Sequence, residues 1–322
     1  MSEVILEVSN LKKHFPTPKG VVHAVDGVDF KIYKGKTLGV VGESGCGKST
    51  TGRLVLRLLE PTEGSVVFEG KDIAHLNKKE LNKIREDIQI IFQDPYASLN
   101  PRMSVGEIIA EPLIIHNVFG KDKEKLQAKV KELMKLVGLA DRLYGSFPHE
   151  LDGGRRQRIG IARALALNPK FIVCDEPVSA LDVSIQAQIL NLMKDLQDKL
   201  GLTYMFITHD LSVVKHFSDD ILVMYLGLEV EKAPAGELFK KNYHPYTKAL
   251  LSAIPVPNID VKQKRIELTG EITSPIDPAP GCRFAARCPY AKDVCFKENP
   301  VFEEISKDHF VACHFTKEIN DI

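Results

Sequence analysis

Apolar residues along this chain alternate between short continuous runs and longer stretches with helical spacing. Residues 37–41, 171–174 and 204–207 are runs of the length expected for buried strands, and helix-like sequence separates them. Residues 48–59 follow the first run directly and show the periodicity of a helix. This alternation predicts an α/β fold with a mainly parallel sheet.

The pattern changes twice along the chain. Within residues 94–158, helices are predicted at 105–116 and 121–139 without intervening strands, which indicates an inserted helical subdomain. Beyond residue 254 the pattern fails, and prolines break regular structure at Pro255, Pro257, Pro275, Pro278 and Pro280. We therefore expect a main domain over residues 1–254 and a C-terminal tail over residues 255–322.

Composition limits the classes of partner. The 322 residues include 43 Lys and Arg against 43 Asp and Glu, and a formally neutral chain argues against nucleic acid as a partner. No run approaches the ~20 apolar residues that span a bilayer, and no signal peptide is visible at the N-terminus. We expect a cytosolic chain that meets a membrane only through a partner. Its six cysteines should then be reduced thiols or metal ligands.

Residues 42–49 fit the phosphate-loop pattern G-x-x-x-x-G-K-[ST] where a predicted strand passes into a predicted helix. Backbone N–H groups of such a loop converge on phosphate oxygens. Lys48 should reach the β- and γ-phosphates of ATP, and the Ser49 hydroxyl should bind Mg²⁺, whereas Cys46 should contribute its backbone rather than its thiol. The predicted nucleotide-binding residues of this segment are Gly42, Glu43, Ser44, Gly45, Cys46, Gly47, Lys48, Ser49 and Thr50.

Two acidic residues end the apolar run 171–174. Asp175 is predicted to hold Mg²⁺, through water, and Glu176 to polarise the water that attacks ATP. The alternative is a pair of solvated carboxylates that cap a helix. The sequence Asp-Glu-Pro followed by Ser-Ala-Leu-Asp at residues 179–182 argues against that alternative.

The run 151–158, Leu-Asp-Gly-Gly-Arg-Arg-Gln-Arg, lies between the phosphate loop and this acidic pair. With all three segments in this order, the chain resembles an ATP-binding cassette (ABC) ATPase. The resemblance implies a P-loop core with an N-terminal antiparallel β region. It also implies that the signature residues Asp152, Gly153 and Gly154 close over ATP held by an opposing cassette.

The resemblance gives roles to three further residues. Gln93 would sense Mg²⁺ and the attacking water, and residues 179–182 would contact the opposite subunit. His209 matches the switch histidine that contacts the γ-phosphate. Phe15 stands where an aromatic ring stacks on adenine, although it could be an ordinary packing residue, and His14 could share the role.

The signature departs from the family pattern, which has Ser and Gln where this chain has Asp152 and Arg155. An ionised Asp152 cannot donate a hydrogen bond, and it brings negative charge towards phosphate. Alternatively, Asp152 is simply the N-cap of its own helix. If repulsion dominates, a homodimer has two impaired sites, so we predict a heterodimer with a second, intact ATPase subunit.

A closer resemblance covers essentially the whole chain. Residues 91–95, 98–102, 174–188, 244–247 and 281–289 are similar to oligopeptide and dipeptide importers, and the chain looks most like their second, F-type ATPase subunit. This implies ATP-driven peptide import at the cytoplasmic face of the membrane, with a second ATPase, two permeases and an extracellular peptide-binding protein. The alternatives are import of another solute such as nickel, a mainly regulatory subunit with weak hydrolysis, and a soluble ABC ATPase of DNA repair or translation.

Four cysteines fall in the tail, with spacings unlike the paired C-x₂-C knuckles of structural zinc. They are not a standard ferredoxin run either. The resemblance to the importers implies a [4Fe-4S] cluster with a structural role, and zinc or four free thiols remain the alternatives. The predicted ligands are Cys282, Cys288, Cys295 and Cys313.

Overall fold

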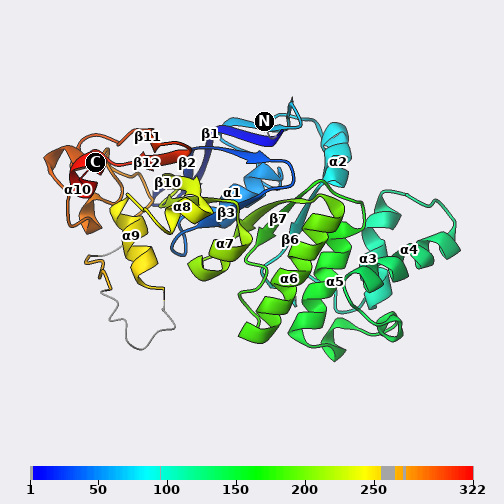
Figure 1. Ribbon diagram of the computed structural model, residues 1–322. Helices are drawn as coiled ribbons and strands as arrows, with labels where there is room; N and C mark the ends of the chain where they lie inside the picture. Colours follow the sequence, from blue (N-terminus) through cyan, green and yellow to red (C-terminus); the bar gives the residue numbers. More distant parts are fainter. Residues whose placement is uncertain (1–2, 95, 255–264, 271–272, 322) are drawn as a thin grey trace. The chain divides into compact units, whose positions relative to one another are not determined.

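The protein is described here by a computed structural model that covers residues 3–94, 96–254, 265–270 and 273–321. It consists of two compact units, one formed by Met1–His75 with Phe206–Ile322 and the other by Leu76–Met205 (Figure 1). Pro95, Pro255 and Pro257 lie outside the described residues.

The first unit contains a four-stranded antiparallel sheet in the order β2-β1-β4-β5. On β2, the buried residues Val28, Phe30 and Ile32 alternate with exposed ones, so one face of the strand packs on the core. The expected N-terminal antiparallel β region is therefore confirmed. Its strands are β1 (Val4–Thr17), β2 (Gly20–Tyr33), β4 (Glu63–Phe68) and β5 (Lys71–Asp72).

A second sheet of this unit has the strand order β11-β12-β10-β9-β3. β3 and β9 are parallel, whereas the pairs from β9 outward to β11 are antiparallel. All five residues of β3 are buried, as expected for a strand covered on both faces. The strands are β3 (Thr37–Val41), β9 (Asp220–Tyr225), β10 (Leu228–Pro234), β11 (Phe302–Ser306) and β12 (His309–Ala312).

The C-terminal tail is more regular than the sequence predicts. β11 and β12 extend the edge of the second sheet through β10, and a short helix follows them. Strands of four and five residues with exposed glutamates carry too few apolar positions for a recognisable pattern. The helices of this unit are α1 (Lys48–Val55), α7 (Leu211–Phe217), α8 (Ala235–Leu238), α9 (Pro245–Ser252), η3 (Ala285–Arg287), η4 (Asp293–Phe296) and α10 (Thr316–Asn320).

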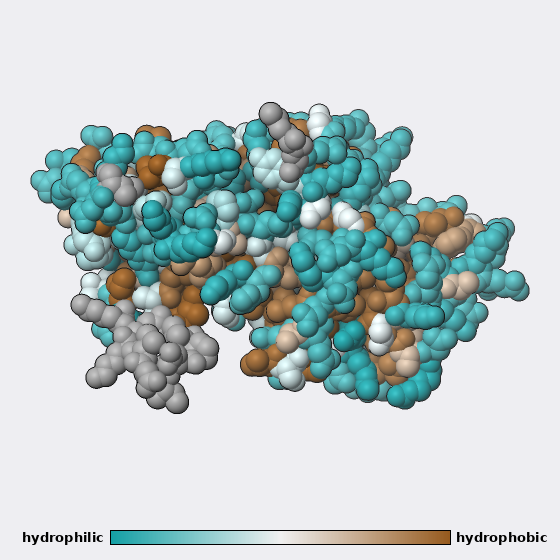
Figure 2. All heavy atoms as spheres, viewed as in Figure 1, coloured by the Kyte–Doolittle hydropathy of each residue, from teal (hydrophilic) through white to brown (hydrophobic). Residues whose placement is uncertain are grey.

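The second unit is mainly helical. β6 and β7 pair in parallel, and the described residues between them form helices and turns without a strand, as predicted. Hydrophobic residues are visible at the surface over the helices of this unit (Figure 2). The elements are α2 (Lys78–Asp87), β6 (Ile88–Ile91), α3 (Val105–Ile115), α4 (Lys123–Leu136), η1 (Asp141–Leu143), η2 (Pro148–Glu150), α5 (Gly153–Leu165), β7 (Phe171–Asp175) and α6 (Val183–Leu200), with β8 (Thr203–Ile207) at the division between the units.

Local sequence explains where these helices begin. Ser104 and Glu107 form a capping box at the start of α3, in which the Glu107 carboxylate accepts a hydrogen bond from the Ser104 N–H at 2.7 Å. Asp152 is the N-cap residue of α5, and Asp182 is the N-cap residue of α6. α1 is shorter than predicted and ends at Val55, because Arg57 has a positive φ of 52°.

Glu229 is a buried acid on β10 that sets a pH dependence of stability. One carboxylate oxygen accepts a hydrogen bond from the Asp29 N–H at 3.3 Å, and the other has no partner among the described residues. Burial, with a contribution from nearby Asp29, raises the pKa of Glu229 well above its ordinary 4.5. The native carboxyl keeps its proton where the unfolded one has lost it, so its contribution to stability falls as the pH rises above 4.5.

We therefore expect Glu229→Gln to stabilise the protein, because the amide carries no ionisable proton. Its melting temperature should exceed that of the unaltered chain by about 2–4 °C at pH 8 and by less at pH 5. Differential scanning calorimetry at the two pH values measures this. Glu303→Gln, on the exposed face of β11, is the control and should change neither value. A gain that is the same at both pH values would contradict the assignment to Glu229.

Candidate active site

The phosphate loop lies between β3 and α1, and its path requires glycine at two positions. Gly47 has φ +103°, and a Cβ there would lie 2.4 Å from the Ala24 carbonyl oxygen. Gly42 has φ +152°, and its Cβ would lie 2.2 Å from the Met224 carbonyl oxygen. Any other residue would clash with backbone, so the two glycines of the motif fix the close packing of the loop.

Lys48 begins α1 and is 5 % exposed. Its ammonium group donates to the carbonyl oxygens of Gly42 at 2.8 Å and Glu43 at 2.9 Å, so the side chain runs along the loop. Burial raises the pKa of the Cys46 thiol, and the Gly227 N–H donates to the Cys46 carbonyl at 2.9 Å. Cys46 therefore holds the loop through its backbone and a neutral thiol. Ser44 and Gly45 are exposed, and Ser49 and Thr50 are partly buried.

Phe15 is partly buried on β1 and pairs with Val22 on β2. The Lys13 ammonium lies 5.0 Å from the centre of its ring. Its predicted contact with adenine stays a prediction. His209 is exposed just after β8, and the N–H of the preceding Thr208 donates to the Val40 carbonyl at 3.1 Å. His209 is thereby held at the end of β3 from which the phosphate loop departs.

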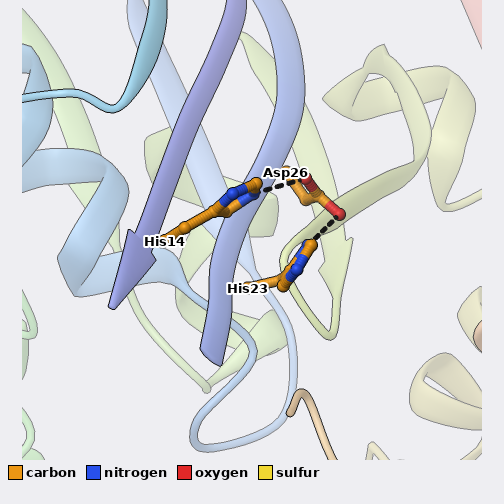
Figure 3. A group of neighbouring side chains, drawn as sticks. All are labelled: His14, His23 and Asp26. Carbon is orange, nitrogen blue, oxygen red and sulfur yellow. Dashed lines mark hydrogen bonds and ion pairs between the residues drawn. The ribbon is translucent and has the colours of Figure 1, made fainter. Parts of the chain in front are cut away.

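Beside Phe15, two histidines share one carboxylate (Figure 3). His14 and His23 lie opposite each other on β1 and β2, with ring centres 3.9 Å apart. Their nitrogens lie 2.7 and 2.9 Å from the two carboxylate oxygens of Asp26, which also pairs with Arg283. Burial acts to raise the pKa of Asp26, but hydrogen bonds from His23 and His14, together with the charges of Arg283 and His23, outweigh it and hold the pKa below its ordinary value.

The second unit brings together three of the predicted catalytic and Mg²⁺-binding residues. Asp175 ends β7 and is 4 % exposed, and Glu176 follows it with a left-handed φ of 48°. The Gln93 side-chain amide, just after β6, donates to the Glu176 carboxylate at 2.9 Å. β6 and β7 are parallel neighbours, so their carboxyl ends place these residues at one edge. The unusual backbone conformation turns Glu176 towards Gln93 rather than along the strand.

The signature residues begin α5 in the same unit. Asp152 accepts a hydrogen bond from the Arg155 N–H at 2.8 Å, as an N-cap does, and its other oxygen lies 3.3 Å from the Arg155 guanidinium. A Cβ on Gly154 would lie 2.7 Å from the Ile185 side chain of α6. Gly154 is therefore required by the packing of α5 on α6, a reason that the sequence alone does not reveal. Gln186 on α6 donates to the carbonyls of Val178 and Leu181 and so holds residues 179–182, which are predicted to contact the opposite subunit.

The four tail cysteines line a single cavity together with His244 and Phe284. The Cys282 N–H donates to the Cys295 carbonyl at 2.7 Å, and none of the four cysteines forms a disulfide. Burial raises the pKa of Cys282 to about 11, and it also raises the pKa of Cys288 and Cys313. Burial therefore favours the protonated form of these three thiols.

Sequence reasoning missed the residues that join this tail to the phosphate loop. The Arg287 guanidinium pairs with the Glu43 carboxylate, and the Glu43 N–H donates to the Tyr246 hydroxyl oxygen at 2.8 Å. Residues more than 200 positions apart leave no mark of such a contact in a single sequence. The phosphate loop, Phe15 and His209 belong to the first unit, whereas Gln93, Asp175, Glu176 and the signature belong to the second.

Comparison with known proteins identifies two family regions. Residues 25–179 match the ABC transporter model, and residues 230–295 match the C-terminal region of oligopeptide/dipeptide transporters. The chain is 53 % identical over 322 residues to the oligopeptide transport ATP-binding protein AppF of Bacillus subtilis, covering 97 % of each chain. It is 51 % identical to OppF of Escherichia coli, with 97 % and 96 % covered. It is 49 % identical to the dipeptide transport protein DppF of Haemophilus influenzae, with 96 % of each covered.

Solved structures of ATP-binding cassettes have a fold similar to that of this chain. The dimeric ATP-binding cassette MJ0796, bound to ADP and phosphate after hydrolysis, has a TM-score of 0.66 at 32 % identity, covering 71 % of this chain and 98 % of that one. The CbiO1 protein of Clostridium perfringens also scores 0.66, at 29 % identity, with 74 % and 92 % covered. None of the described helices combines the length and apolar character that crossing a bilayer requires. The chain thus belongs to the ABC transporter family as an ATP-hydrolysing cassette, and it carries the C-terminal region of the oligopeptide/dipeptide transporters.

Proposed function

We propose that this cassette powers the import of oligopeptides or dipeptides through a membrane ABC transporter. Similarity over nearly the whole chain to ATP-binding proteins of oligopeptide and dipeptide transport carries the proposal. Its partners in this scheme are two permeases, a peptide-binding protein outside the cell and a second ATPase subunit, at the cytoplasmic face of the membrane. The exposed Ile114, Ile115 and Val118 of the helical region support a surface that contacts other subunits.

In the proposed mechanism, the chain's own residues bind ATP and activate water. Lys48 reaches the β- and γ-phosphates, and backbone N–H groups of the phosphate loop surround them. The predicted Mg²⁺ ligands are Asp175 and Gln93 of the second unit and Ser49 of the first, and Mg²⁺ would neutralise phosphate charge when bound. Glu176 accepts the proton of the attacking water and Gln93 orients its carboxylate, as their 2.9 Å hydrogen bond supports. His209 contacts the γ-phosphate, and closure of two cassettes drives the permeases.

We expect Glu176→Gln to bind ATP with little change in Kd, because the amide keeps the shape of the side chain. ATP turnover in the complex with its co-purifying ATPase partner should fall at least about a hundredfold, because the general base is lost. Phosphate release measures turnover, and equilibrium titration measures Kd. Glu132→Gln, an exposed acid on α4, is the matched control and should keep both values. Turnover of Glu176→Gln like that of the unaltered complex would remove Glu176 as the base.

We further propose that the four tail cysteines hold a [4Fe-4S] cluster. Four thiols that share one cavity are the ligand set of such a cluster. The spacings of the four cysteines differ from the paired C-x₂-C knuckles of structural zinc, which supports a cluster over zinc. The role of the group is structural, and it takes no part in ATP hydrolysis.

Protein purified without oxygen should contain about four iron atoms per chain and absorb visible light, as thiolate-bound clusters do. Cys288→Ser should lower the iron content and loosen the tail, which limited proteolysis detects. Cys46→Ser is the control, since Cys46 lies in the phosphate loop, and it should keep the iron. If the protein contains one zinc per chain and no iron, the cluster proposal is wrong and the cysteines bind zinc. If it contains neither metal, the proposal is also wrong and the four cysteines are free thiols.

We propose that the second ATPase differs from this chain. The side chain of Asp152 is 58 % exposed, and as a carboxylate it cannot donate to a phosphate of an opposing cassette. The hydrogen bond from the Arg155 N–H to Asp152 also supports the alternative in which Asp152 is the N-cap of its helix. The two interpretations are compatible, because one oxygen can cap the helix while the negative charge stays at the helix start. A heterodimer would pair the catalytic set of this chain with an intact Ser-Gly-Gly signature.

The isolated chain should therefore hydrolyse ATP slowly, and addition of the partner ATPase should raise turnover. Asp152→Ser should raise the turnover of the isolated chain about tenfold or more while leaving its melting temperature nearly unchanged, because serine also caps helices. Steady-state phosphate release and calorimetry measure the two quantities. Vigorous hydrolysis by the unaltered chain alone would contradict the heterodimer.

A further inference from the structure

We infer that Arg287 and Tyr246, both outside the ATP-binding motifs, are positioning residues that clamp Glu43 of the phosphate loop and set the affinity of the loop for ATP. This phosphate-loop clamp, made of Arg287, Tyr246 and Glu43, lies wholly within the first unit. It joins the loop to the segments that carry the tail cysteines. The inference rests on ATP binding by this family and holds whichever group the four thiols carry.

The ion pair of the clamp is bidentate. The two terminal nitrogens of Arg287 lie 2.7 and 3.1 Å from the two carboxylate oxygens of Glu43. Such a fork fixes the direction of the carboxylate as well as its position. The hydrogen bond to Glu43 raises the pKa of Arg287 above its already high ordinary value, so the guanidinium is always charged.

The burial of Arg287 indicates a purpose other than stability. Its side chain is 8 % exposed, and its Nε atom has no hydrogen-bond partner among the described residues. Burying a charged group with an unsatisfied donor is unfavourable, and a buried ion pair is often no more stable than apolar packing. The arginine at this position is best explained by the group that it holds, which is the acidic residue of the phosphate loop.

Tyr246 holds the backbone of the same residue. Its hydroxyl oxygen accepts a hydrogen bond from the Glu43 N–H at 2.8 Å, and its ring is fully buried. The rings of Tyr225 and Phe284 pack on it, with centres 4.7 and 5.5 Å away. The peptide between Gly42 and Glu43 is therefore held by a rigid aromatic cluster, and this peptide leads into the loop whose N–H groups surround phosphate.

Both clamp residues are tied to the cysteine cavity by short segments. Arg287 ends η3 and directly precedes Cys288. The Tyr246 N–H donates to a ring nitrogen of His244 at 3.1 Å, and His244 and Phe284 line the cavity with the four cysteines. Two side chains therefore connect the surroundings of the cysteine cavity to the phosphate loop. On the same tail segment, Arg283 pairs with Asp26 in the histidine cluster of Figure 3.

Electrostatics gives the clamp its expected effect on ATP. Glu43 brings a negative charge into a loop that must receive a triphosphate, and Arg287 neutralises that charge. Without Arg287, the carboxylate would repel the phosphates and lose its fixed direction. The defect should then depend on the charge of Glu43 and decrease as salt screens it.

The test is equilibrium binding of ATP with Mg²⁺ to the full-length chain. Arg287→Met keeps much of the apolar length of the side chain and should raise the Kd about tenfold, equivalent to losing one charge-assisted contact. The double variant Arg287→Met with Glu43→Gln should recover most of that loss, because the unpaired charge is gone. Tyr246→Phe should raise the Kd about threefold. The defect of Arg287→Met should become smaller as ionic strength rises.

Lys292→Met is the matched control, because it breaks an exposed ion pair with Glu318 in the same tail that does not reach the loop. It should leave the Kd unchanged. A Kd of Arg287→Met within twofold of the unaltered chain, or a double variant that binds as weakly as the single one, overturns the clamp. If Arg287→Met does not fold, Tyr246→Phe decides, and an unchanged Kd there overturns the inference. The iron content of the cysteine variants tests only the cluster proposal, and the Kd for ATP of the clamp variants tests only the clamp. Either proposal can therefore be wrong without the other.

Discussion

The pairing of Glu43 with Arg287 is the constraint that ties the phosphate loop of the first unit to its C-terminal tail. A carboxylate within a phosphate loop must be neutralised and held aside, and here the neutralising group comes from the C-terminal tail. Arg287 at the end of η3 and Tyr246 on α9 both contact Glu43, and the rings of Tyr225, Tyr246 and Phe284 pack on one another beside them. The loop glycines have the complementary role, since Gly42 and Gly47 let the backbone approach neighbouring carbonyls that a Cβ would strike.

In the second unit, two adjacent acids have different environments. The Asp175 side chain is buried, whereas the Glu176 carboxylate accepts a hydrogen bond from Gln93. Asp175 continues the buried strand, but Glu176 leaves it with a left-handed backbone conformation that non-glycine residues rarely adopt. The Gln93 amide and the turn at Ser179, whose hydroxyl donates to the Glu176 carbonyl, hold that conformation. Strain of this kind persists only where surrounding contacts determine it, and such sites are often functional.

Sequence motifs predicted the phosphate loop, the acidic strand end and the helical insertion because each depends on local chemistry within a few residues. The pattern over residues 105–139 predicted α3 and α4 nearly to their bounds. The tail strands β11 and β12 were not predicted, because their stability comes from pairing with β10 rather than from their own apolar content. The Arg287–Glu43 and Gly154–Ile185 contacts were also inaccessible, since they join elements whose proximity only the folded chain creates.

The tail is therefore better regarded as part of the nucleotide-binding unit than as an appendage. Val311 on β12 is fully buried and pairs with Glu231 on β10, while the Glu231 carboxylate accepts hydrogen bonds from the backbone of Tyr243 and His244. His309 lies 2.7 Å from the same carboxylate. One buried acid thus connects β12, the start of α9 and the wall of the cysteine cavity. Because α9 also carries Tyr246, hydrogen bonds through His244 and Tyr246 connect Glu231, and with it β12, to the Glu43 backbone of the phosphate loop.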